Sequence, residues 1–167
     1  MLPEPEPYRR IIGRLLYLTL TRPDISYAVQ HLSPFLQQPT DLHYQGATHV
    51  LRYLKGTPNK GLFYPKSTNF QVVAYTDADW GACQMSSRSL TGYCVFLGDA
   101  LVSWKTKKQK TIAKSSVKAE YRAMSATTSE LDWIAHLLQD LFLPLHLLVM
   151  MHCDNSSTAH SREPRLP

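Results

Sequence analysis

The spacing of apolar side chains predicts that the first third of the chain is helical. Between Tyr8 and Leu20 these side chains recur three and four residues apart, which places them on one face of a helix. Pro23 ends this pattern, Asp24 is of a type that caps a following helix, and Gly56 ends a third apolar stripe. We therefore expect a flexible leader and then three short helices, over residues 1–7, 8–20, 25–37 and 41–55.

Beyond residue 60 the pattern changes to that of strands and one long helix. Runs rich in β-branched and aromatic residues predict strands, and Gly98-Asp99 predicts the turn of a hairpin. Ser115 is a plausible cap for a long helix that ends near Leu143, before Pro144. The expected strands are Gly61–Tyr64, Gln71–Thr76, Leu90–Leu97, Ala100–Trp104 and a buried strand Leu147–Cys153. This order predicts a mixed α/β sheet with a packed helix, over residues 65–167, after a helical segment over residues 8–64.

Composition and charge narrow the class of protein. The 167 residues are 44% hydrophobic and 19% charged, which is typical of a globular chain. The net charge of +5 fits a polyanionic partner without proving one. The three cysteines match neither a zinc site nor a redox pair, so we expect reduced thiols in an intracellular protein, cytoplasmic or nuclear. We expect no membrane segment, because the longest apolar run is too short to span one.

Three acidic residues stand at positions where they would meet. Asp77 and Asp154 each follow a predicted strand, and Glu120 lies on the apolar face of the long helix. Taken singly, each has a structural explanation: the helix dipole for Glu120, a turn or a helix cap for the two aspartates. Taken together, they change the picture: in an α/β sheet with this helix packed on it, the first and last strands would be neighbours, and the three carboxylates could converge at one sheet end. Carboxylate oxygens are the ligands that Mg²⁺ prefers, and two such ions support phosphodiester hydrolysis.

A lysine-rich stretch, WKTKKQKTIAKSS, precedes the long helix. Its side chains would contact nucleic-acid phosphates beside the acidic residues. A solvated loop is the alternative, and composition alone slightly favours that alternative. The residues concerned are Lys105, Lys107, Lys108, Lys110, Lys114 and Ser115.

Several ordered motifs resemble a known family. YTDADWGAC from Tyr75, KAEYRAM from Lys118 and HCDNSS from His152 resemble the ribonuclease H domain of copia-type long-terminal-repeat retrotransposon polyproteins. The upstream segment YRRIIGRLLYLTLTRPDISYAVQHLSPFL, from Tyr8, is similar to the segment that connects reverse transcriptase to ribonuclease H in those polyproteins. The resemblance implies a ribonuclease H-like fold and cleavage of the RNA strand of an RNA–DNA hybrid with Mg²⁺ or Mn²⁺. It also implies the reverse transcriptase part of the same polyprotein as a partner.

The same resemblance assigns roles to individual residues. Asp77, Glu120 and Asp154 match the family's acidic motifs and would be its catalytic metal ligands, and the lysine-rich stretch would contact the hybrid. The family uses a fourth carboxylate downstream, whereas only Glu163 follows Asp154 here. We therefore expect a domain that is incomplete at its C-terminus. The alternatives to an active nuclease are a catalytically inactive nucleic-acid-binding remnant and a fragment that folds poorly.

Overall fold

The chain folds into two compact units, which we describe separately. The computed structural model describes residues 1–66, 71–83, 85–143 and 149–154. The first unit spans Met1–Leu62 and the second spans Phe63–Pro167.

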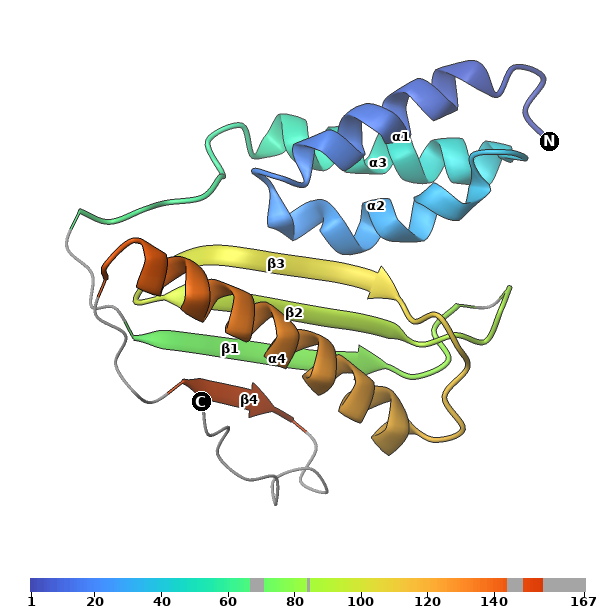
Figure 1. The fold of residues 1–167 in the computed structure, drawn as a ribbon. Coiled ribbons are helices and arrows are strands. Elements are labelled where there is room, and N and C mark those ends of the chain that lie inside the picture. Colours follow the sequence, from blue (N-terminus) through green and yellow to red (C-terminus); the bar gives the residue numbers. More distant parts are fainter. Residues whose placement is uncertain (67–70, 84, 144–148, 155–167) are drawn as a thin grey trace. The chain divides into compact units, whose positions relative to one another are not determined.

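The first unit is made of helices, as the apolar spacing predicts (Figure 1). Tyr8, Ile12 and Val29 have no exposed surface and form the centre of its core. The first helix begins inside the segment that we predicted to be a flexible leader, and the backbone amide of Leu2 donates to Pro39 O at 2.9 Å. The elements are α1 (Glu6–Leu18), η1 (Pro23–Ile25), α2 (Ser26–Leu32), η2 (Ser33–Phe35) and α3 (Asp41–Gly56).

A buried arginine ties the turn after α1 to the end of α3. Arg22 Nη2 lies 2.7 Å from Asp24 Oδ2, and Arg22 Nη1 donates to Thr57 O at 3.0 Å. The hydroxyl of Tyr53 donates to the same Asp24 oxygen at 2.8 Å. The hydrogen bond from Arg22 is the main cause that lowers the pKa of Asp24 to about 2. This network joins three segments of the unit through one carboxylate.

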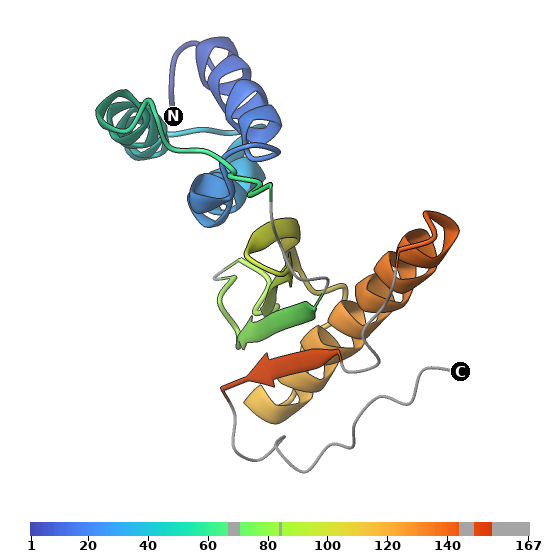
Figure 2. The ribbon, with the colours of Figure 1, turned by 90° about the vertical axis from the view of Figure 1, so that its left-hand side faces the viewer.

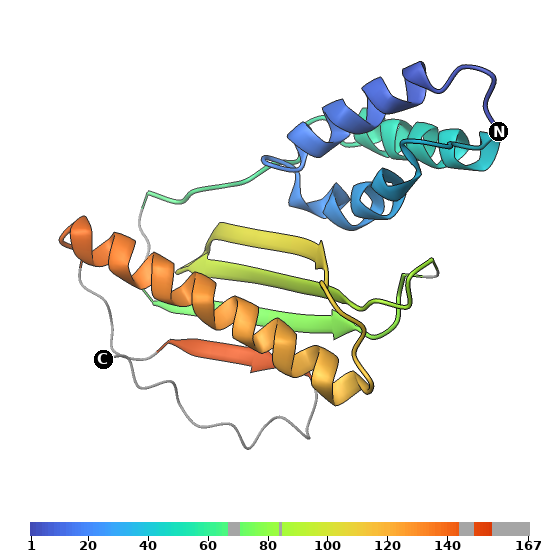
Figure 3. The same cartoon turned by 45° about the vertical axis from the view of Figure 1, so that its right-hand side comes forward.

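The second unit is built on a four-stranded mixed sheet with the strand order β3-β2-β1-β4 (Figures 1 and 3). β1 pairs antiparallel with β2, β2 pairs antiparallel with β3, and β1 pairs parallel with β4. The expected mixed α/β fold is confirmed, and it is consistent with the ribonuclease H-like fold that the motifs imply. The strands are β1 (Val72–Asp79), β2 (Leu90–Leu97), β3 (Ala100–Lys108) and β4 (Met150–Cys153).

One long helix, α4 (Ser116–Asp140), packs on one face of this sheet (Figure 2). Ser115 caps it, as predicted, by accepting a hydrogen bond from the Lys118 amide at 3.2 Å. Its apolar stripe packs on the strands near the C-terminal end of the helix, and alanines allow close approach near the N-terminal end. Between these regions the buried Thr127 hydroxyl lies 2.9 Å from that of Thr76. The helix is therefore fixed against β1 along most of its length.

Three strand predictions need correction. Gly61–Tyr64 is not a strand: it includes the boundary between the units and pairs with no strand in the described ranges. β1 continues to Asp79 and β3 to Lys108, because β2 offers backbone partners along both. Asp77 therefore lies within its strand instead of closing it.

The last strand also differs from its prediction. β4 begins at Met150, and residues 147 and 148 of the predicted strand lie outside the described residues. Its side chains alternate between exposed and half-buried, so the strand is not buried as we expected. Among the described residues, β4 forms one edge of the sheet. Within the part of the chain that the structure covers, no helix is both long and apolar enough to cross a membrane.

Candidate metal centre and basic cavity

The ends of β1 and β4 bring two of the predicted acidic residues to the same end of the sheet. These strands are parallel neighbours, and their last paired residues are Thr76 and Cys153. Asp77 and Asp154 come one residue later, Asp77 within β1 and Asp154 directly after β4. The adjacency of the first and last strands, on which the predicted convergence depends, is therefore confirmed.

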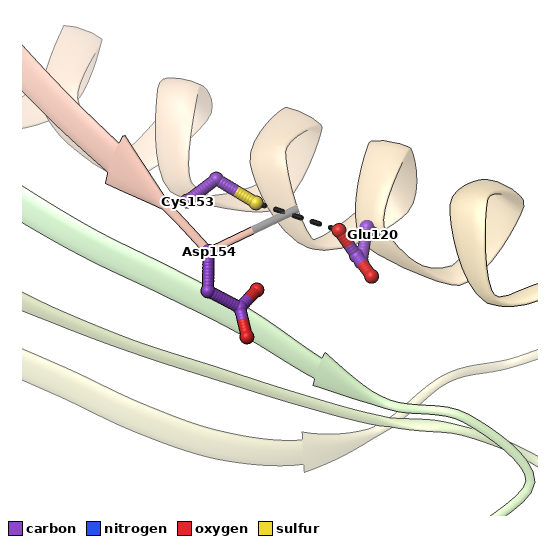
Figure 4. Close-up of side chains that lie close together, drawn as sticks. All are labelled: Glu120, Cys153 and Asp154. Carbon is purple, nitrogen blue, oxygen red and sulfur yellow. Dashed lines mark hydrogen bonds between the residues drawn. The ribbon is translucent and has the colours of Figure 1, made fainter. Parts of the chain in front are cut away.

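Glu120 of α4 meets the end of β4 and completes a cluster of three side chains. Ligand atoms of Glu120, Cys153 and Asp154 all lie within 4.8 Å of one another (Figure 4). The Cys153 thiol donates to Glu120 Oε2 at 3.5 Å, and only 7% of the Glu120 surface is exposed. Since a buried carboxylate is costly without polar partners, this contact helps to hold Glu120 in place.

Asp77 is not a member of this cluster. Its side chain is exposed, and its Oδ1 accepts a hydrogen bond from the Ala78 amide at 2.7 Å. Its cross-strand partner is Gly92, where an added Cβ would meet no atom within 4 Å. Open space therefore lies beside Asp77, and its role as a metal ligand stays a prediction.

The donor atoms of the cluster suit a hard divalent cation. Mg²⁺ is commonly held by one or two carboxylates together with substrate phosphates, and Glu120 and Asp154 supply two carboxylates. The sulfur of Cys153 is a softer donor that favours ions such as Zn²⁺. The two carboxylates thus suit Mg²⁺ or Mn²⁺, whereas the thiol is a poor ligand for either ion.

Most of the predicted basic residues line one cavity between α4 and the β2–β3 hairpin. The cavity has a volume of about 660 Å³. Lys105, Lys107 and Lys108 lie on strand β3, not in a solvated loop, because that strand is longer than predicted. Lys114 and Ser115 are not among the lining residues, and Ser115 serves as the helix cap. The cationic lining residues are Lys105, Lys107, Lys108, Lys110 and Arg122.

Hydrogen bonds fix the walls of this basic cavity. Glu130 of α4 accepts from the Tyr93 hydroxyl at 3.0 Å and from the Ser103 hydroxyl at 2.7 Å. Burial, and then the Glu130 carboxylate, raise the pKa of Tyr93 to about 12. Gln109 Nε2 donates to Ala119 O at 2.9 Å, which attaches the end of β3 to the first turn of α4.

The cysteines occupy distinct environments. All three are free thiols. A hydrogen bond from Lys108 is the largest of the effects that lower the pKa of Cys83 to about 7, whereas burial raises the pKa of Cys94. Cys153 belongs to the carboxylate cluster. The pKa values of these two thiols are therefore shifted in opposite directions.

Sequence reasoning missed Cys153, Arg122 and Glu130. Cys153 precedes a predicted ligand, and the alternation of strand side chains would have directed it toward the helix once the strand was placed. Arg122 lies two residues after Glu120 and Glu130 ten residues after it, with no motif that marks either. Their place beside the lysines depends on how α4 packs on β2 and β3.

The chain is similar to long retrotransposon polyproteins along almost its whole length. It is 47% identical over 154 residues to a retrovirus-related Pol polyprotein from transposon RE2 of Arabidopsis thaliana, and 37% identical over 152 residues to one from transposon TNT 1-94 of Nicotiana tabacum. These alignments include 92% and 90% of this chain but 11% of each polyprotein, so the chain spans about a tenth of their length.

A shorter relative is matched over most of its length. The chain is 42% identical over 129 residues to secreted RxLR effector protein 161 of Plasmopara viticola, and the alignment includes 77% of this chain and 91% of that protein. No family model and no solved structure matches the chain.

Proposed function

We propose that this chain, which belongs to the family of retrovirus-related Pol polyproteins from transposons, is the ribonuclease H region of such a polyprotein. Its substrate would be the RNA strand of an RNA–DNA hybrid. Its partner would be the reverse transcriptase part of the same polyprotein, inside the cell, in the cytoplasm or the nucleus. The observation that carries this proposal is the meeting of Glu120 and Asp154 beside the carboxyl end of β1.

The proposed reaction is hydrolysis with two Mg²⁺ or Mn²⁺ ions. Bound ions would activate water and stabilise the leaving oxygen of the cleaved phosphodiester. Glu120 and Asp154 would hold an ion through their carboxylates, and Asp77 would join them from the next strand. The chain contributes a buried glutamate, positioned by α4 and by its contact with Cys153, so its carboxylate is oriented before substrate arrives.

A catalytically inactive nucleic-acid-binding remnant is the second candidate. The observation that favours it is the absence of Asp77 from the group that Glu120 forms with Cys153 and Asp154. With two carboxylates whose ligand atoms lie within 4.8 Å of each other, the cluster supports one cation more readily than two. In this case the basic cavity would retain a role while hydrolysis would not occur.

A cleavage assay separates these candidates. The full chain is incubated with an RNA–DNA hybrid labelled on the RNA strand, in Mg²⁺ or Mn²⁺. A ribonuclease H cuts the RNA of the hybrid and leaves a duplex of DNA intact. A folded chain that binds the hybrid without cutting it is the inactive remnant.

A further inference from the structure

The cluster of Glu120, Cys153 and Asp154 contains one donor atom that the proposed nuclease chemistry does not use. The two carboxylates offer oxygen atoms, which suit Mg²⁺. Cys153 offers a sulfur atom, which Zn²⁺ binds well and Mg²⁺ binds poorly. This mixed set of donor atoms therefore selects among divalent ions differently from a set of carboxylates alone.

The alternation of side chains along β4 places this thiol in the cluster and keeps the neighbouring imidazole out of it. Successive side chains of a strand point to opposite faces of the sheet. The ring of His152 stacks on that of Tyr75, with the ring centroids 5.0 Å apart. Cys153 lies on the other face, where its thiol contacts Glu120 of α4. The donor set is therefore one sulfur and two carboxylates, without a nitrogen ligand from β4.

The spacing of the donor atoms suits a tetrahedral zinc site. Cys153 Sγ lies 3.5 Å from Glu120 Oε2. A sulfur at about 2.3 Å and an oxygen at about 2.0 Å from a tetrahedral Zn²⁺ ion would lie about 3.5 Å apart. A carboxylate oxygen of Asp154 lies within 4.8 Å of the ligand atoms of both residues, and Asp154 is exposed, so its side chain has room to turn toward an ion. Three protein ligands leave the fourth position of the tetrahedron to water.

Secondary structure holds two of the three ligands in place. Glu120 lies on the long helix α4 and is only 7% exposed. Cys153 is the last paired residue of β4, opposite Thr76 of β1. Two helical turns beyond Glu120, the buried Thr127 hydroxyl lies 2.9 Å from that of Thr76, which fixes α4 against the same strand. Because these ligands are ordered beforehand, an ion that binds them costs the chain little conformational freedom.

Zn²⁺ gains more from this donor set than the ions of the proposed reaction do. It precedes Mn²⁺ in general affinity for protein ligands, and a thiolate strengthens that preference. Mg²⁺ retains several of its water molecules and gains nothing from sulfur. When Zn²⁺ binds, the Cys153 thiol would release its proton to solvent, and shared coordination would replace its hydrogen bond to Glu120.

We propose that Cys153, Glu120 and Asp154 bind Zn²⁺ in preference to Mg²⁺, so that zinc occupies the carboxylates that the proposed reaction requires. The inference rests on the proposed function only for its consequence, which is inhibition of cleavage. The binding of zinc rests on the cluster alone. Cys153 thus gives the chain a sensitivity to zinc that a site made only of carboxylates would lack.

Binding of Co²⁺ to the full chain tests this site without a nucleic-acid substrate. Co²⁺ binds to the same kinds of ligand as Zn²⁺, and its bond to a thiolate adds a charge-transfer absorption in the near ultraviolet. The original protein should show this absorption. Zn²⁺ should abolish it by displacing cobalt, whereas a large excess of Mg²⁺ should not. Cys153→Ser, which keeps a hydrogen-bond donor beside Glu120, should lose the absorption and bind Zn²⁺ about tenfold to a hundredfold more weakly.

Two further variants make this test specific. Cys83→Ser removes a thiol that is not a member of the cluster and should keep the absorption. Asp154→Asn changes an exposed ligand and should also weaken zinc binding, which keeps the test decisive if Cys153→Ser does not fold by circular dichroism. Absorption that survives in Cys153→Ser, or that a large excess of Mg²⁺ removes, would overturn the proposal.

Cleavage of an RNA–DNA hybrid in Mg²⁺ gives a separate result. In a chain that cleaves the hybrid, Zn²⁺ should inhibit the original protein at lower concentrations than it inhibits Cys153→Ser, each compared with its own rate without zinc. Equal sensitivity of the two proteins would overturn the inhibitory role. Cobalt absorption in a chain that cuts no hybrid would support the zinc site although the nuclease fails, so the two failures are distinguishable.

Discussion

Cys153 Sγ lies 3.5 Å from Glu120 Oε2, which joins the edge strand β4 to the buried side of α4. Neither residue is close to the other in sequence, and the contact exists because β4 returns to the sheet beside β1. The thiol donates to the carboxylate of a residue that is only 7% exposed. A buried carboxylate costs stability unless polar or ionic partners compensate it, and the cation of the proposed function would be such a partner.

Replacement of Glu120 by glutamine should therefore stabilise the metal-free protein. The neutral amide removes a buried charge at nearly constant volume, and we expect a gain of about 1 kcal/mol. Mg²⁺ should raise the melting temperature of the original protein but not that of the variant, because binding to the folded state stabilises it. Thermal unfolding with and without Mg²⁺ measures both effects.

Asp132→Asn, which changes an exposed acid of the same helix, is the matched control and should leave the response to Mg²⁺ unchanged. A loss of stability in metal-free Glu120→Gln would show that the carboxylate is structural.

The buried hydroxyl pair of Thr76 and Thr127 should behave as a coupled unit. Thr127 donates to Ala123 O as well as lying 2.9 Å from Thr76 Oγ1. Thr127→Val removes one partner and should cost about 1–3 kcal/mol, since it leaves the Thr76 hydroxyl buried without that partner. The double change to valine should cost less than the sum of the single changes. Urea unfolding of the four proteins gives the coupling energy, and simple additivity would contradict the contact.

Lowering the pH should reduce the stability of the first unit, because Asp24 becomes protonated. The pKa of Asp24 is lowered to about 2 in the folded chain from an ordinary value of 3.8. A lowered carboxyl pKa contributes stability that is present above the unfolded pKa and is lost as the pH falls through about 4 toward 2. Asp24→Asn should remove this contribution, so the helical unit should lose less stability than the original between pH 5 and 2. Circular dichroism during unfolding measures the difference.

Arg22→Gln provides the second arm of this experiment, because it removes the main cause of the lowered pKa. It should also flatten the dependence on pH in this range. Equal acid sensitivity in all three proteins would show that another carboxylate controls the unit.

Cys83 should react before Cys94 at neutral pH. Its pKa is lowered to about 7, chiefly by Lys108, whereas burial raises that of Cys94. Thiolate is the reactive form, so alkylation at pH 7 should modify Cys83 well before Cys94. Lys108→Gln should slow the reaction of Cys83 at pH 7 and leave its rate well above pH 9 almost unchanged. Mass spectrometry of each cysteine during timed alkylation gives the rates, and faster reaction of Cys94 would contradict this assignment.

The regular elements could be predicted from the sequence where local pattern and tertiary structure agree. β2 occupies Leu90–Leu97 as predicted, because its alternating apolar residues face α4 and its turn residues follow at once. The cap at Ser115 was likewise visible in the sequence, since a serine before a helical stripe has a local function. The adjacency of the first and last strands followed from the order of elements.

Features that depend on pairing between distant segments could not be predicted. The lysine-rich segment after Trp104 lacks the composition of a strand. It forms the end of β3 because β2 supplies backbone hydrogen-bonding partners. The basic cavity depends on that pairing, so Arg122 and Glu130 carried no local signal. In the same way, the place of Cys153 in the cluster depends on the register between β1 and β4.

Cleavage of a hybrid tests the central claim most directly. The full chain is incubated in Mg²⁺ or Mn²⁺ with an RNA–DNA hybrid labelled on the RNA, beside Glu120→Gln and Asp77→Asn. The proposed function predicts RNA fragments from the original chain, and their loss in both variants. Intact RNA after incubation with a chain that circular dichroism shows to be folded, and that binds the hybrid, would contradict nuclease activity and leave the inactive remnant.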